Sequence, residues 1–244
     1  MDEDIVRWVL EFLLRQPIDD SVINALLSVL PIANNDSRLK KTLLLRRIDT
    51  EVSDASVSEK IMELLEIVEE LDHRDGKSAS ELMKAAYCAV AVDCTVRFLE
   101  DSVETSGKYL EAVKRIWRKK LSKMEKLEKN GGGLVSENLL RWRDDIEAAI
   151  TDSIVRDKIL MSNTRNEALK AVRAYLKESW ESMGPSFLEY VVQTMSKMEN
   201  KELGTGGEAM GDQLGKGVEK GVSACHKFVV SHNTAVDEGG RGEY

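Results

Sequence analysis

The strongest constraint on the fold comes from residues 78–101, whose apolar side chains cover almost the whole circumference of a helix. They are Leu82, Met83, Ala85, Ala86, Tyr87, Cys88, Ala89, Val90, Ala91, Val92, Cys94, Val96, Phe98 and Leu99. A helix that is apolar on every side is stable only when other elements surround it. Its most apolar part, residues 85–92, is far shorter than the ~20 residues that cross a bilayer. We therefore expect a central helix covered by its neighbours, and no membrane as partner.

Most other segments repeat apolar residues at steps of three and four, the spacing of amphipathic helices. Only 3 Pro, 4 Phe, 5 Tyr and 4 Trp are present, which disfavours a sandwich or barrel of strands. Four pairs have the spacing of a helix capping box: Ser56 with Glu59, Ser78 with Glu81, Thr164 with Glu167, and Ser186 with Glu189. The sequence predicts an all-α fold, a multi-helix bundle of antiparallel helices around the central apolar helix.

Glycine divides the chain into two parts. Ten of the sixteen glycines fall after residue 203, between scattered polar residues. A segment of this composition buries too little apolar surface to offset the entropy lost on folding. We predict a helical bundle domain over residues 1–200 and a glycine-rich, disordered tail over residues 201–244.

The three cysteines, Cys88, Cys94 and Cys225, form no Cys-x-x-Cys pair and no even framework. This usage is typical of an intracellular, reducing compartment. Cys88 and Cys94 stand six residues apart among alanine and valine, so about 100° per residue turns them to different sides of a helix. We expect them to be small buried hydrophobes and not a pair of metal ligands.

Residues with catalytic or ligand-binding spacing are scarce. Glu70 and His73 have the Glu-x-x-His spacing of di-iron bundles, but such a site needs a second copy. His226 and His232 lack that spacing, and the sequence has no phosphate-binding glycine loop and no His-Glu-x-x-His motif. We predict that the protein is not an enzyme and takes no cofactor, metal or small-molecule substrate, with His73 near the end of a helix.

Charge is segregated along the chain, although the formal net charge is only −8. Residues 108–129 hold nine basic and three acidic residues, a net of +6, whereas residues 49–72 hold nine acidic residues and one basic residue, a net of −8. In one interpretation these two helices attract each other or expose their charges to solvent on opposite faces. In the other, the basic stripe meets phosphate or an acidic partner.

Two basic helix faces are the candidate partner-binding surfaces. The first comprises Arg38, Lys41, Arg46 and Arg47, and the second comprises Lys114, Arg115, Arg118, Lys119 and Lys123. The helix over residues 108–129 has no obvious Asn or Gln array for reading bases, and Trp117 falls in its apolar stripe. Any nucleic acid would therefore be held through its phosphates.

Three stretches have a common resemblance: residues 8–15 (WVLEFLLR), 36–46 (DSRLKKTLLLR) and 179–189 (SWESMGPSFLE). Together they resemble the N-terminal helical region of plant telomere-repeat-binding-factor-like proteins, over roughly residues 1–195. The resemblance implies a nuclear protein from a family whose C-terminal Myb-type helix-turn-helix contacts duplex DNA. After residue 200 this chain is glycine-rich and has no tryptophan, so the resemblance supplies no DNA-contacting residue.

These observations favour a non-enzymatic, nuclear helical module for protein interaction or dimerisation, whose partner is another protein or a second copy of the chain. The alternative is a nucleic-acid-binding protein that uses the basic helix over residues 108–129 through phosphate contacts.

Overall fold

The computed structural model describes residues 2–30, 36–99, 103–127 and 133–202, and in these ranges it contains helices and no strand. The predicted all-α class is confirmed. No helix of these ranges has the length and apolar character needed to cross a bilayer. The chain forms two compact units, Met1–Val192 and Gln193–Tyr244. Apart from its first two positions, the predicted tail, residues 201–244, lies outside the described residues.

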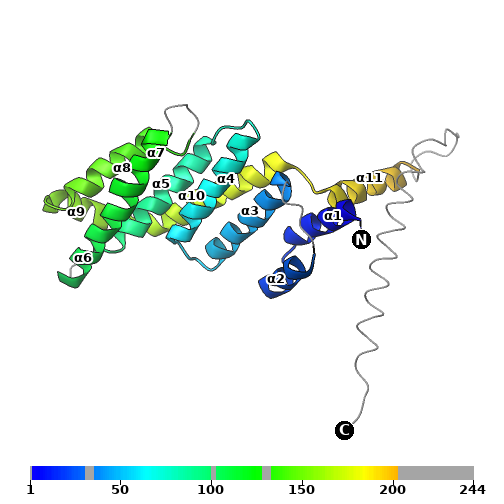
Figure 1. The fold of residues 1–244 in the computed structure, drawn as a ribbon, viewed down its shortest axis with the longest axis horizontal. Coiled ribbons are helices and arrows are strands. Elements are labelled where there is room, and N and C mark those ends of the chain that lie inside the picture. The colour runs from blue at the N-terminus through cyan, green and yellow to red at the C-terminus, as the bar shows by residue number, and fades with distance from the viewer. Residues whose placement is uncertain (1, 31–35, 100–102, 128–132, 203–244) are drawn as a thin grey trace, which may run out of the picture. The chain divides into compact units, whose positions relative to one another are not determined.

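Helices follow one another with short connections (Figure 1). They are α1 (Glu3–Leu14), α2 (Asp20–Val29), α3 (Ser37–Ser53), α4 (Glu59–Arg74), α5 (Glu81–Val96), α6 (Val103–Ala112), η1 (Val113–Leu121), α7 (Ser122–Leu127), α8 (Glu137–Ala148), α9 (Ser153–Leu160), α10 (Thr164–Met183) and α11 (Phe187–Glu202). The helix η1 is a π-helix, and α11 continues from the first unit into the second.

Polar side chains mark most helix starts. Ser186 and Glu189 form the predicted capping box: the Ser186 N–H donates to Glu189 Oε2 at 2.7 Å, and the Glu189 N–H donates to Ser186 Oγ at 3.3 Å. The other three predicted boxes are wrong by one or two positions, because a neighbouring polar residue precedes the helix instead: Ser58, Ser80 and Asn163.

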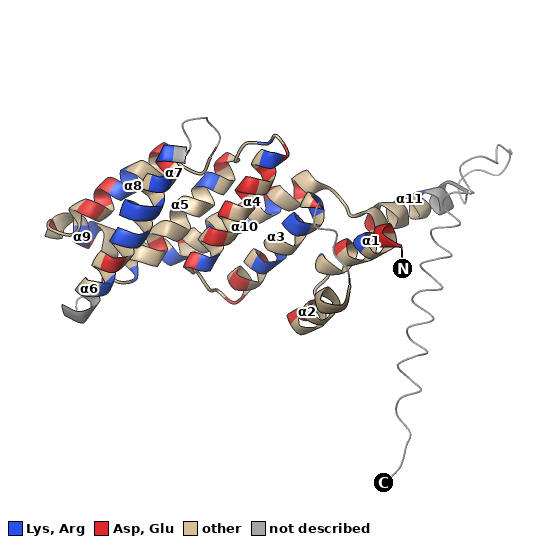
Figure 2. Cartoon of the chain, viewed as in Figure 1, with Lys and Arg blue, Asp and Glu red and all other residues tan. Residues whose placement is uncertain are grey.

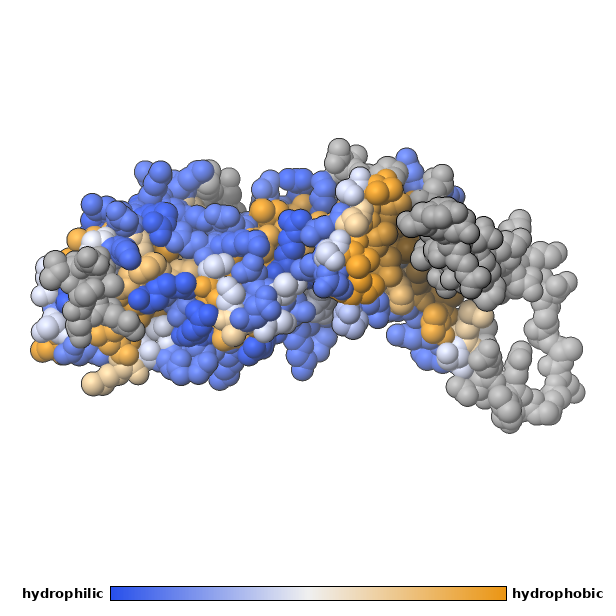
Figure 3. All heavy atoms as spheres, turned by 90° about the horizontal axis from the view of Figure 1, so that it is seen from below, coloured by the Kyte–Doolittle hydropathy of each residue, from blue (hydrophilic) through white to orange (hydrophobic). Residues whose placement is uncertain are grey.

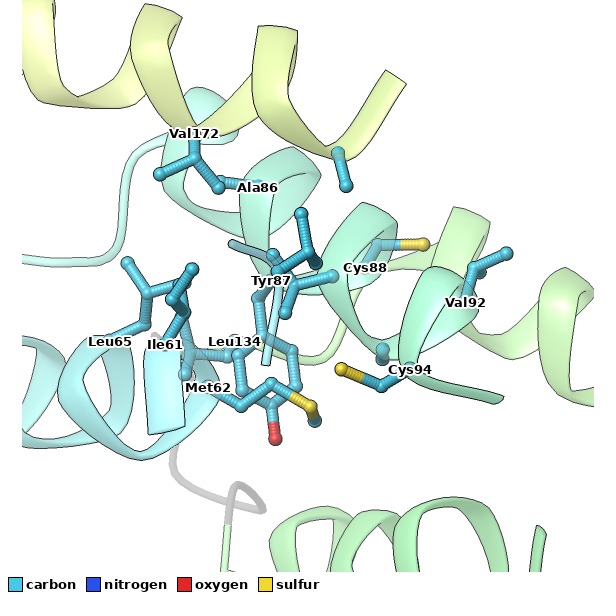
Figure 4. Packing of buried hydrophobic residues seen from close by; sticks show 14 of the residues in the cluster. Ile61, Met62, Leu65, Ala86, Tyr87, Cys88, Val92, Cys94, Leu134 and Val172 are labelled. Carbon is cyan, nitrogen blue, oxygen red and sulfur yellow. The ribbon is translucent and has the colours of Figure 1, made fainter. Parts of the chain in front are cut away.

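The central helix of the first unit is α5, as its all-round apolar character predicts. The helix α10 packs along it, and α4, α6, η1 and α8 also contact it. Figure 4 shows Ile61 and Leu65 of α4 and Val172 of α10 beside this helix. Eleven residues of α5 are buried: Met83, Ala86, Tyr87, Cys88, Val90, Ala91, Val92, Asp93, Cys94, Thr95 and Val96.

Asp93 is the charged residue in this set, only 3% exposed. Its carboxylate accepts a hydrogen bond from Arg97 Nη2 at 2.9 Å and another from the Thr164 hydroxyl at 3.0 Å. A buried carboxylate is tolerated when such partners satisfy it. Asp93 thereby ties the start of α10 to the central helix.

A smaller apolar cluster holds the N-terminal helices together. It consists of Val6, Leu10, Leu14, Ile23 and Leu39, from α1, α2 and α3. In α2 only Ile23 is fully buried, whereas Val22 and Val29 remain 48% and 79% exposed. Figure 3 shows apolar side chains gathered on the side of the molecule that carries this helix.

Candidate functional site

The second predicted basic face lies on a helix with unusual winding. Residues Val113–Leu121 form a π-helix, with hydrogen bonds from i to i+5 and not i to i+4. In an α-helix, at about 100° per residue, Lys120 would return to the same side as the buried Val113. The wider π-helical turn, about 80° per residue, carries Lys120 away from Val113 and onto the flank of the helix that faces α4. Val113, Ile116, Trp117 and Leu121 stay in the core while Lys120 leaves it.

Four lysines form a row on the outer face of η1 and α7. They are Lys114, Lys119, Lys123 and Lys126, called the lysine ridge below. With about 80° per residue in η1 and 100° in α7, all four fall within a sector of about 60°. All four are exposed, and none forms an ion pair with a carboxylate in the described part of the chain. Figure 2 shows the basic residues clustered on this helix, between α5 and α8.

On the side facing α4, the flank of the ridge is held by ion pairs. Arg115 Nε lies 2.9 Å from Glu59 Oε2, and Lys120 Nζ lies 2.8 Å from Glu66 Oε1. Glu66 also accepts a hydrogen bond from the Tyr87 hydroxyl at 2.7 Å. The hydrogen bond to Glu59 raises the pKa of Arg115. The predicted attraction between residues 108–129 and 49–72 is therefore present as side-chain contacts.

On the side facing α8, the flank is held in the same way. Arg118 Nε donates to Glu147 Oε1 at 2.7 Å, which raises the pKa of Arg118 and lowers that of Glu147. Glu125 of α7 pairs with Arg143 of α8 at 2.9 Å. Among the basic residues of η1 and α7 that the structure describes, the four lysines of the ridge are thus the ones without a carboxylate partner.

The first predicted basic face is mostly occupied by contacts within the protein. Arg38 Nε lies 2.7 Å from Glu11 Oε1, and its Nη1 and Nη2 donate to the carbonyl oxygens of Met183 and Pro185 at 2.7 and 2.9 Å. This guanidinium joins α3 to α1 and to the connection between α10 and α11. Lys41 Nζ lies 2.7 Å from both carboxylate oxygens of Asp72 on α4.

Arg46 supports the turn between α1 and α2. Its Nη1 donates to the carbonyl oxygens of Leu14 and Gln16 at 3.0 and 2.7 Å, and its Nη2 donates to that of Ile18. Its Nε pairs with Asp20 at 3.1 Å. The neighbouring Arg47 is exposed and makes no ion pair with a described residue.

The nine candidate residues therefore divide by role. Five of them hold helices together: Arg38, Lys41, Arg46, Arg115 and Arg118. The other four remain available to a partner: Arg47, Lys114, Lys119 and Lys123. Lys126, which was not among the nine, continues the ridge. Contacts with helices far apart in the sequence determine which of the nine basic residues are occupied. The residues next to each of them in the sequence therefore could not predict the outcome.

The buried thiols are poor candidates for chemistry. Cys88 and Cys94 are each 1% exposed, as expected for small core residues, and burial raises the pKa of both to about 12. Glu70 and His73 are exposed, and Glu70 pairs with Arg74 at 2.8 Å. No group of three or more potential metal ligands occurs among the described residues.

An open cleft of about 760 Å³ lies where α3 meets the turn after α1. Arg15 and Arg46 line it, together with Trp180 and the carboxylates of Asp19 and Asp49. Both guanidinium groups already bind protein atoms: Arg15 Nη1 donates to the Gly184 carbonyl oxygen at 2.7 Å and stacks over the Trp180 ring at 5.3 Å. The sequence did not predict this cleft, because its lining combines residues of α1, α2 and α3 with residues of α10 and α11 from the far end of the domain.

Comparisons with family models, with curated proteins and with solved structures find no match for this chain.

Proposed function

We propose that this protein is a non-catalytic helical module that binds a protein partner through the lysine ridge. The resemblance to telomere-repeat-binding-factor-like proteins adds to this proposal a nuclear location. The proposed protein partner is either a second copy of this chain or a different protein.

The observation that supports the proposal is the arrangement of charge around η1. Arg115, Arg118 and Lys120 are bound to carboxylates of neighbouring helices, which fixes the position of the π-helix. Lys114 and Lys119 project between these pairs, are exposed, and have no carboxylate partner among the described residues. Charges carried on an already formed helix require no ordering of the backbone on binding, and complementary charge on a partner favours specific association.

The experiment compares three forms of the full chain. In the ridge variant, Lys114, Lys119, Lys123 and Lys126 are replaced by Glu. In the control variant, four exposed lysines elsewhere are replaced by Glu, so the net charge changes equally: Lys77, Lys158, Lys170 and Lys177. Circular dichroism first establishes that both variants keep the helical fold.

Each form is then used to capture proteins from a nuclear extract, and its own association state is measured by sedimentation. We expect the wild type and the control variant to retain the same partner or to form the same oligomer, and the ridge variant to lose it. Equal retention and equal oligomeric state in all three forms would contradict the proposal.

A further inference from the structure

We infer that the lysine ridge takes a single acidic protein segment in helical form, and that it does not take duplex nucleic acid. This inference rests on the proposed function and names the chemistry of the partner at the same site.

The spacing of the ridge fits a helical partner. Lys114, Lys119 and Lys123 lie on successive turns, so their side chains follow one another at about 5–6 Å along the helix axis. Carboxylates at i and i+4 of an α-helix have the same separation. A helix that presents Glu or Asp at every turn can therefore place one carboxylate beside each ammonium group.

The neighbours of η1 exclude the usual approach to DNA. A recognition helix enters a major groove about 12 Å wide and brings both its sides close to the phosphates. Here Arg115 pairs with Glu59 of α4 and Arg118 pairs with Glu147 of α8, so each flank of η1 faces a neighbouring helix. A groove that received η1 would have to accommodate these two helices as well, whereas the outward line of lysines is accessible without them.

The flanking helices also carry the wrong charge for phosphate. On α4, the exposed Glu63 lies between Glu59 and Glu66 at helical spacing, and on α8 Asp144 lies one turn before Glu147. A duplex lying on the ridge would press its phosphate rows against these carboxylates, which is unfavourable. A single acidic helix contacts the ridge alone and avoids them.

The test uses the full chain with defined probes and measures fluorescence anisotropy. The first probe is a helical peptide of about 20 residues with Glu at every fourth position. The second has the same length with Lys at those positions, and the third is a DNA duplex of about 20 base pairs. Each is titrated with the wild type, the ridge variant and the control variant at about 50 and 200 mM salt.

We expect the acidic peptide to bind the wild type and the control variant equally, and to bind the ridge variant at least about tenfold more weakly. We expect its affinity to fall with salt, and the lysine peptide and the duplex to bind more weakly than the acidic peptide. Replacing the four ridge residues by Arg keeps the charge and preserves binding.

Three results would overturn the inference: no binding of the acidic peptide, duplex binding at least as tight as peptide binding, or peptide binding that does not respond to reversal of the ridge. If the ridge variant loses its captured partner while the acidic peptide fails to bind, the inference fails and the proposed function stands. If capture and oligomeric state are unchanged in the ridge variant, the proposed function itself fails.

Discussion

The indole N–H of Trp117 donates a hydrogen bond of 2.8 Å to the hydroxyl oxygen of Thr95, which joins the π-helix to the central helix. Both residues are completely buried, and the Thr95 hydroxyl in turn donates to the Ala91 carbonyl oxygen at 2.9 Å. Trp117 lies on the core side of η1, opposite the outward line of Lys114 and Lys119. This bond therefore fixes the rotation of η1, and with it the direction of the ridge.

Replacing Thr95 by Val is expected to lower the free energy of unfolding by about 1–3 kcal/mol, because the Trp117 N–H is left buried without an acceptor. Thr42→Val is the matched control. Thr42 is equally buried, but its hydroxyl only donates to the Arg38 carbonyl oxygen at 2.9 Å, so its loss leaves no orphaned donor. Urea unfolding measures both. Equal costs in the two variants would contradict the role given to the Trp117 bond.

Arg46 is expected to be irreplaceable by Lys. The guanidinium satisfies three carbonyl oxygens and one carboxylate at once, whereas an ammonium group lacks this fork of donors. Arg46→Lys should lower the free energy of unfolding by about 2–3 kcal/mol, and Arg47→Lys, at the exposed neighbouring position, should change it by less than about 0.5 kcal/mol. Thermal or urea denaturation measures the stability of both variants. An equal loss of stability in Arg46→Lys and Arg47→Lys would contradict the stabilising role of the Arg46 contacts.

Lys41 and Asp72 form an ion pair in which each side chain is only 12% exposed. Lys41→Met leaves the carboxylate buried without its partner and should cost about 3–5 kcal/mol. The double variant Lys41→Met, Asp72→Leu removes both charges, so it should recover most of that loss. Denaturant titrations of the single and double variants test this. A double variant no more stable than the single one would show that the lost charge pair is not the cause.

Ionisation of the buried thiols is expected to lower the free energy of unfolding at alkaline pH. Burial raises the pKa of Cys88 and Cys94 in the folded chain to about 12, whereas an unfolded thiol has a pKa of about 8.5. The stability that the two protonated thiols give the folded state is complete at pH values below the pKa of an unfolded thiol. It is lost as the pH rises towards the pKa of the folded thiols, by up to about 1.4 kcal/mol per pH unit for each thiol. Tyr109 and Tyr175, whose pKa values burial also raises, add to this loss above about pH 10.

Unfolding measured between about pH 8.5 and 10 isolates the thiols. In this window the double variant Cys88→Ala, Cys94→Ala should lose stability with pH less steeply than the wild type. In a Cys225→Ser background, the two buried thiols should also react with a thiol reagent only as fast as the chain unfolds. Rapid reaction of the folded chain, or identical pH slopes, would show that these thiols are accessible.

Some of this architecture follows directly from the sequence. The apolar circumference of residues 78–101 predicts the burial of α5. The opposite charges of residues 49–72 and 108–129 indicate that the two segments could attract each other, but not that Arg115 would pair with Glu59 and Lys120 with Glu66. The π-helical winding is harder to predict, because Val113 and Trp117 point inward under either winding. The available signal was Lys120, a charge that α-helical spacing would place inside the apolar stripe.

The functions of individual arginines could not be predicted from their surroundings in the sequence. Arg46 and Arg47 are neighbours, yet one is enclosed by the turn after α1 and the other is exposed. Arg38 binds carbonyl oxygens about 145 positions further along the chain. Such contacts depend on how helices pack, and helical periodicity describes only which face of each helix is apolar.

Lysine acetylation footprinting of the full chain, read by mass spectrometry with and without the acidic peptide, shows whether the lysine ridge is the surface that binds the peptide. We expect rapid modification of Lys114, Lys119, Lys123 and Lys126 in the free protein and protection of all four in the complex. Lys41 should remain unmodified in both states, and Lys77 should be modified equally in both. Unchanged modification of the four ridge lysines when the peptide is bound would contradict the claim that this face is the binding surface.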